Sequence, residues 1–137
     1  EEDYRTILRR TTATEEIELQ PVSDAETVVR MRNVVRSVPV PEHVETKAIQ
    51  MIMATQPDNA YSSALAKDIV ALGASPRGVQ SLILAGKVRA LLEGRFAVST
   101  EDLIAVAFDV LRHRILVNFQ GMSDGISSDD VIKQVIQ

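Results

Sequence analysis

The sequence Leu-Gly-Ala-Ser-Pro-Arg-Gly at residues 72–78 carries the sharpest local signal in the chain, because it predicts where a long helix begins. Ser75 suits the N-cap position and Pro76 the first helical position, which places Arg77 in the first turn. Apolar residues at helical spacing follow as far as Glu93, and Gly94 is a typical stop. Close helix packing is expected at Gly86, which lies on the apolar face.

Helical spacing also dominates the sequence before this segment. Residues 1–10 are acidic at the front and basic at the back, which favours a first helix. A capping box at residues 23–26 (Ser-Asp-Ala-Glu) predicts the start of a second helix, which Pro39 ends. Pro41 suits the first turn of a third helix. The apolar stripe predicted for the second helix is Val28, Met31, Val35 and Val38, and that of the third is Val44, Ala48, Met51, Ile52 and Thr55.

Two further helices are predicted after Gly94. Ser99 caps the first, with Asp102 three residues later, and Arg112, His113 and Arg114 suit its C-terminal end. Residues 115–119 are predicted to be extended and residues 120–127 to form a loop. Ser127 then caps a last helix. The apolar positions of these two helices are Leu103, Ile104, Ala107, Val110, Leu111, Val131, Ile132, Val135 and Ile136.

Two segments allow more than one interpretation. Residues 11–22 are polar and form a connector, although alternation at Ile17 and Leu19 allows a short strand. Residues 62–72 fit a helix through Leu65, Ile69 and Leu72, but residues 69–72 also fit a short extended run, and an irregular entry into the next helix is favoured. The whole pattern predicts an all-α protein, a small bundle of about five or six helices with short extended links.

Composition excludes several classes of site. The 137 residues contain no Cys and two His, which removes disulfides, Cys-ligated zinc, iron–sulfur clusters and thiol nucleophiles. The net charge of −4 argues against nucleic acid as a partner, and a helix-turn-helix DNA binder is disfavoured for the same reason. No stretch reaches the ~20 apolar residues of a membrane span. The absence of an initiator Met suggests a segment cut from a longer protein.

Arg77 is the candidate residue for chemistry. A guanidinium on the first turn of a helix joins the positive end of that helix, and both favour a phosphate oxygen. Spacing alone nevertheless favours a solvated or ion-paired arginine. Residues 73–78 lack the Gly-Lys-Ser/Thr ending of a phosphate-binding loop, so the chain is not expected to be a self-sufficient enzyme.

Residues 72–78, followed by an Ala- and Leu-rich helix and Gly94-Arg95, resemble the lid of the MoxR family of AAA+ ATPases. Other stretches agree with this family along nearly the whole chain, namely residues 1–4, Ile7-Leu8, 98–103, 110–116 and 128–132. Residues 58–70 match no pattern of the family. The resemblance implies that residues 1–22 are the end of an ATPase core with its connector, and that residues 23–137 are the helical lid.

The resemblance also implies a function. Arg77 would be the sensor 2 residue that reaches the γ-phosphate of ATP, with Ser75, Pro76 and Gly78 beside it at the nucleotide. ATP and Mg²⁺ would bind in the parent protein, and this chain alone would be inactive. The expected partners are its own ATPase core, a homo-oligomeric ring, expected to be a hexamer, and a von Willebrand factor A domain protein or a client, in the cytoplasm. The implied role is chaperone-like, in cofactor insertion or complex maturation.

Several alternatives stay open. The chain could be a stand-alone helical interaction module in which Arg77 meets an acidic partner. Arg30, Arg32 and Arg36 could form a ring interface, but a solvated face is favoured. Met51 and Met53 are expected to fill the core. Asp124, Asp129 and Asp130 could suggest calcium, but their spacing does not fit an EF-hand loop.

Overall fold

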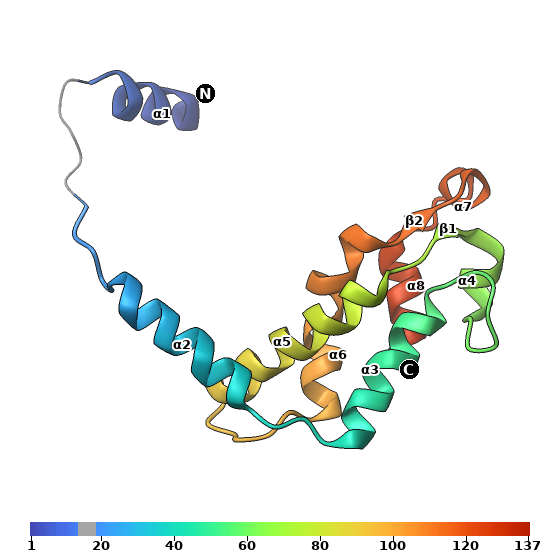
Figure 1. The fold of residues 1–137 in the computed structure, drawn as a ribbon. Helices are drawn as coiled ribbons and strands as arrows, with labels where there is room; N and C mark the ends of the chain where they lie inside the picture. Colours follow the sequence, from blue (N-terminus) through green and yellow to red (C-terminus); the bar gives the residue numbers. More distant parts are fainter. Residues whose placement is uncertain (14–18) are drawn as a thin grey trace. The chain divides into compact units, whose positions relative to one another are not determined.

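The computed structural model describes residues 1–13 and 19–137, which form two compact units, Glu1–Arg30 and Met31–Gln137. Each unit is described by itself (Figure 1). The short strand considered at Ile17 and Leu19 falls largely outside the described residues. The division of function predicted at residues 22 and 23 stays a prediction.

The first unit contains α1 (Glu2–Thr12) and the beginning of α2 (Ala25–Ser37). Acidic residues lie in the first turn of α1 and arginines in its last, as the helix dipole favours. The capping box predicted at residues 23–26 is wrong. Asp24 caps α2 instead, because its Oδ1 accepts from the Thr27 amide at 2.7 Å, and this bond lowers the pKa of Asp24. A carboxylate at this end of a helix is favoured over a hydroxyl by the dipole.

The second unit is a helical bundle with one small antiparallel ribbon, which confirms the all-α class. β1 (Val70–Leu72) pairs with β2 (Leu116–Val117) through Val70 opposite Val117 and Leu72 opposite Leu116, with an irregularity between them. Figure 1 shows this ribbon beside α7 (Phe119–Ser123) at one end of the bundle. After α2 the elements are α3 (Glu42–Ala54), α4 (Ala64–Ile69), β1 (Val70–Leu72), α5 (Pro76–Leu92), α6 (Thr100–Leu111), the 3-10 helix η1 (Arg112–Arg114), β2 (Leu116–Val117), α7 (Phe119–Ser123) and α8 (Ser128–Val135).

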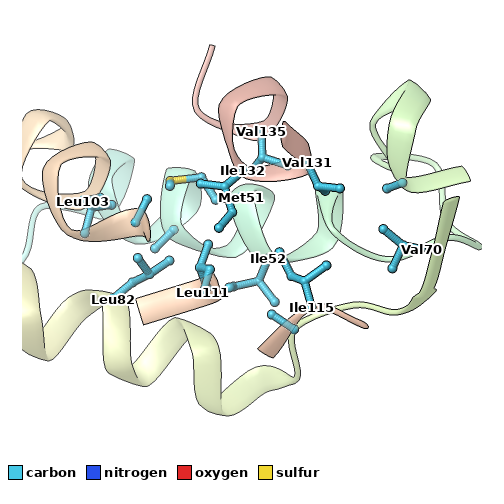
Figure 2. Packing of buried hydrophobic residues seen from close by; sticks show 14 of the residues in the cluster. Met51, Ile52, Val70, Leu82, Leu103, Leu111, Ile115, Val131, Ile132 and Val135 are labelled. Carbon is cyan, nitrogen blue, oxygen red and sulfur yellow. The ribbon is translucent and has the colours of Figure 1, made fainter. Parts of the chain in front are cut away.

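The core is aliphatic and lies between α3, α5, α6 and α8 (Figure 2). All five predicted stripe positions of the third helix are buried, including Thr55, whose side chain is fully enclosed. The stripe predicted for α2 is different, because Val38 is buried whereas Val28 and Met31 are about half exposed. Periodicity predicts an apolar face, but it does not say whether anything covers that face.

Close packing of α5 against α6 depends on Gly86. A Cβ there would lie 3.1 Å from Val98 Cγ1 and 3.2 Å from Leu103 Cδ2, so even one methyl group would crowd the contact. The expectation of tight packing at this glycine is confirmed. None of the helices in the described part of the chain is both long and apolar enough to span a membrane.

Helix ends were predicted with mixed success. The capping boxes at Ser99–Asp102 and Ser127–Asp130 are both present. The irregular entry favoured for residues 62–72 is wrong, because the segment contains both regular alternatives in turn: α4 runs to Ile69 and β1 follows it. The predicted loop at residues 120–127 is partly wrong, because α7 occupies its first half. Asn118 caps that short helix by accepting from the Gly121 amide at 2.9 Å, a local bond that the Gly- and Ser-rich composition hid. Pro41 is the N-cap of α3 rather than part of its first turn.

Candidate functional site

Arg77 lies in the first turn of α5, a helix of 17 residues, and its side chain is exposed. Pro76 precedes it as the first helical residue, and Ser75 holds the N-cap position without a capping bond from its side chain. Among the described residues, no carboxylate forms an ion pair with Arg77 and no hydrogen bond holds its guanidinium. The guanidinium is thus available to a ligand.

The backbone just before Arg77 is held by the end of α3. The Ala74 amide donates to Thr55 Oγ1 at 2.9 Å, and Gln56 Nε2 donates to the Ala74 carbonyl at 2.7 Å. The side chains of Thr55 and Gln56 therefore bind both the backbone N–H and the backbone C=O of Ala74. Thr55 Oγ1 also donates to the Ile52 carbonyl at 2.7 Å, which fixes its own rotamer. Thr55 and Ala74 are fully buried, so the bond between them is shielded from water, whereas the bond from Gln56 is only partly buried.

Two glycines allow the same segment to approach α3 closely. A Cβ at Gly73 would lie 2.7 Å from the Thr55 carbonyl carbon and 2.9 Å from Gln56 Cα. A Cβ at Gly78 would lie 2.8 Å from Ile52 Cδ1. Backbone atoms cannot yield as a flexible side chain can, so Gly73 is the stricter requirement. Together these contacts fix the backbone on both sides of Arg77 and leave its side chain in solvent.

This arrangement is chemically suited to an anion. The amino end of α5 carries the positive end of the helix dipole, and Arg77 adds a full positive charge to it. A guanidinium also offers paired N–H donors that match phosphate oxygens. Residues 1–13 and 19–137 contain no group of three or more His, Asp or Glu side chains arranged to hold a metal ion. The site as described can therefore bind phosphate oxygens, but the residues around it do not form a metal centre.

Arg112 and Arg114 have partners within the fold. Arg112 binds Asp129 with two hydrogen bonds, of 2.7 Å from Nε and 3.0 Å from Nη2, and this contact lowers the pKa of Asp129. Arg114 donates to the Val110 carbonyl at 2.9 Å, the helix-end contact expected from the sequence. Asp130 accepts from Ser127 and pairs with Lys133 at 2.9 Å. These acidic side chains serve ion pairs and caps.

Remaining residues behave more simply. Arg30, Arg32 and Arg36 are exposed, and the choice between a solvated face and a ring interface stays a prediction. Met51 is buried in the core and Met53 is partly buried. Sequence reasoning missed the contacts of Thr55 and Gln56 with the loop before α5. Periodicity places Thr55 on the core stripe and composition places Gln56 in a turn. Their partner lies 18 or 19 residues away, and such a separation leaves no periodic signal in a single sequence.

Comparison with known proteins assigns this architecture to a family. The AAA lid domain family matches residues 62–135, a range that includes Arg77. The match also covers residues 62–70, so the expectation that residues 58–70 match no pattern of the family is wrong for that part. Residues 62–135 begin after Thr55 and Gln56, which lie outside this match.

Curated relatives and one solved structure agree with the family match. The chain is 37% identical over 89 residues to the Chaperone MoxR1 of Mycobacterium tuberculosis, a match that covers 65% of this chain and 24% of that protein. It is 51% identical over 45 residues to the Protein MoxR of Methylorubrum extorquens, covering 33% of this chain and 13% of the relative. A crystal structure of a candidate ATPase from Cytophaga hutchinsonii has a TM-score of 0.80 at 27% identity and covers 98% of this chain and 41% of its own. The chain thus spans about a quarter of the length of the mycobacterial relative.

Proposed function

Since the chain belongs to the AAA lid domain family and is the C-terminal lid of a MoxR-type AAA+ ATPase, we propose that Arg77 is its sensor 2 residue. In this role Arg77 contacts the γ-phosphate of ATP held by the ATPase core. The side chain neutralises charge on the transferred phosphoryl group as water attacks. Ser75, Pro76 and Gly78 form the turn that presents it.

One observation carries this proposal, namely a guanidinium that forms no ion pair or hydrogen bond with any residue that the structure describes, on a helix start held by its neighbours. An exposed arginine in a first turn opposes the helix dipole, so it does not stabilise its own helix. The backbone around it is nevertheless fixed by Thr55, Gln56 and close contacts at two glycines. A fixed backbone beneath a free cation is the arrangement that binding a phosphate oxygen requires.

The rest of the active site belongs to the proposed core. Residues that bind Mg²⁺ and the other phosphates are assigned there, since the described part of this chain offers no cluster of metal ligands. Mg²⁺ supplies charge neutralisation at the phosphates. We expect this chain alone to be inactive, and the complete protein to form a ring of identical subunits, in which release of phosphate frees Arg77 and lets the lid move.

The cellular role is proposed from the relatives. One of them is named a chaperone, and this supports a chaperone-like role in complex maturation for the protein that contains this lid. A von Willebrand factor A domain protein or a client, met in the cytoplasm, is the proposed partner.

The test is Mg²⁺-dependent ATP hydrolysis by the full-length protein expressed from its natural gene. Arg77→Ala should reduce kcat by about 10²–10³, the usual loss when one group that stabilises transition-state charge is removed. Arg77→Lys should recover only part of the rate, because an ammonium is a point charge without the planar fork.

The matched control is Arg32→Ala, which removes an exposed arginine of α2 outside the site. It should leave kcat unchanged. Both alanine variants should unfold at the wild-type temperature, because neither arginine is buried. Equal rates for wild type and Arg77→Ala would contradict the sensor role. A natural gene without a core that binds nucleotides would instead favour the stand-alone interaction module.

A further inference from the structure

We propose that Thr55 and Gln56 are positioning residues for ATP hydrolysis, which act by fixing the backbone that presents Arg77. This inference rests on the proposed function of Arg77. The two side chains follow the last turn of α3, and neither lies within residues 62–135, the range matched by the family. They carry no charge and are assigned no contact with ATP.

The contact is specific to one residue of the loop. The Thr55 hydroxyl accepts from the N–H of Ala74, and the Gln56 side chain donates to the C=O of Ala74. The peptide groups on both sides of Ala74 are therefore fixed in direction. Close packing at Gly73 prevents the loop from moving toward α3. The bonds from Thr55 and Gln56 prevent it from moving away.

The end of α3 is itself rigid. Thr55 Oγ1 and the Thr55 backbone N–H both donate to the Ile52 carbonyl. The backbone N–H of Gln56 donates to the Met53 carbonyl at 3.1 Å. Asn59 Nδ2 donates to the same Met53 carbonyl at 2.7 Å. The side chains that hold Ala74 therefore start from a backbone that has its own hydrogen bonds.

Arg77 is three residues from Ala74, so any shift of this peptide is passed to the first turn of α5. A misplacement of about 1 Å at a catalytic group can cost ~10²-fold in rate. Loss of one of the two bonds should therefore reduce the rate by less than loss of the guanidinium. The effect should be on kcat, because the binding of ATP rests mainly on the core.

The experiment compares four forms of the full-length protein: wild type, Gln56→Glu, Arg77→Ala and the double variant. Gln56→Glu keeps the size of the side chain but replaces the N–H donor by an oxygen that faces the Ala74 carbonyl. We expect kcat to fall on the order of tenfold, with KM for ATP changed by less than about threefold. The matched control is Gln50→Glu, the same change at an exposed position of α3, which should leave kcat unchanged.

Thr55 provides a second, independent pair. Thr55→Val keeps the shape of the side chain but removes the hydroxyl, and should lower kcat. Thr55→Ser keeps the hydroxyl and should have a kcat close to that of the wild type. Thr55→Val leaves the buried Ala74 amide without a partner and can unfold the lid. Gln56→Glu, at a partly exposed position, keeps the test decisive in that case.

The double variant separates the outcomes. If Gln56 acts through Arg77, adding Gln56→Glu to Arg77→Ala should not reduce kcat further. Two results would overturn the positioning role and leave the sensor role standing. In the first, Arg77→Ala lowers kcat but Gln56→Glu has the wild-type kcat. In the second, both variants lower kcat and the two losses multiply in the double variant. A normal rate for Arg77→Ala overturns the proposed function and this inference with it.

Discussion

Arg95 holds the buried carboxylate of Asp102 with two hydrogen bonds, from Nη1 to Oδ2 at 2.7 Å and from Nη2 to Oδ1 at 2.5 Å. The same carboxylate caps α6, because Oδ2 also accepts from the Ser99 amide at 2.9 Å. The side chain of Asp102 is only 1% exposed. This contact joins the turn after α5 to the first turn of α6, the helix against which α5 packs.

The pKa of Asp102 is lowered, first by the hydrogen bond from Arg95 and against the effect of burial. We expect Asp102→Asn to reduce the free energy of unfolding at pH 7 by about 2 kcal/mol. Because the folded pKa lies below the unfolded one, the contribution of Asp102 is complete above the unfolded pKa of ~4 and is lost as pH falls through the folded pKa. Urea unfolding of wild type and variant at pH 7 and at pH 3 measures this difference.

The control is Asp109→Asn, an exposed carboxylate on the same helix, which should change the free energy of unfolding by less than about 0.5 kcal/mol. An Asp102→Asn deficit that stays constant from pH 7 to pH 3 would contradict the account, since it would come from packing and not from the charged pair.

Gly73→Ala should destabilise the lid by about 2 kcal/mol, because the added Cβ meets the backbone of Thr55 and Gln56. Gly94→Ala is the comparison, since Gly94 has a φ of 71° with nothing within 4 Å of an added Cβ. Its cost should be about 1 kcal/mol, from the left-handed backbone alone. Denaturant unfolding measures both. Equal costs would show that the close approach of the loop to α3 is not limiting.

The aliphatic core predicts a contrast along one helix. Leu82 of α5 is fully buried, so Leu82→Ala should reduce the free energy of unfolding by about 3 kcal/mol through lost burial and a residual cavity. Leu92→Ala, in the same helix but 83% exposed, should cost less than about 0.5 kcal/mol. Thermal unfolding followed by circular dichroism should show only the first shift. Similar shifts in unfolding temperature for the two variants would contradict the burial of Leu82 in the core.

Much of the fold could be predicted because local chemistry and tertiary packing agree. Ser99, Ser127 and Pro76 mark helix starts that the structure confirms, and the stripe of α3 is buried at every predicted position. Local signals failed where two good caps compete, as at Ser23 and Asp24, where the carboxylate one residue later prevails. They also failed at α7, a single turn set by the Asn118 cap.

Only one part of the candidate site could be predicted from the sequence. Arg77 could be singled out because its helix start has a local signature. Its support could not, since the bonds from Thr55 and Gln56 to Ala74 join residues that only the fold brings together. The sequence also does not show whether an apolar helix face is covered by another element. Val28 and Met31 lie on such a face of α2 and are exposed.

Discrimination between ATP and ADP by the full-length protein tests the role of Arg77 most directly. The affinities of a slowly hydrolysed ATP analogue and of ADP are measured for wild type and Arg77→Ala, with Arg32→Ala as the control. A contact with the γ-phosphate predicts that Arg77→Ala weakens binding of the ATP analogue on the order of tenfold or more and leaves ADP nearly unchanged. Equal weakening of both nucleotides, or of neither, would contradict the contact and with it the proposed function.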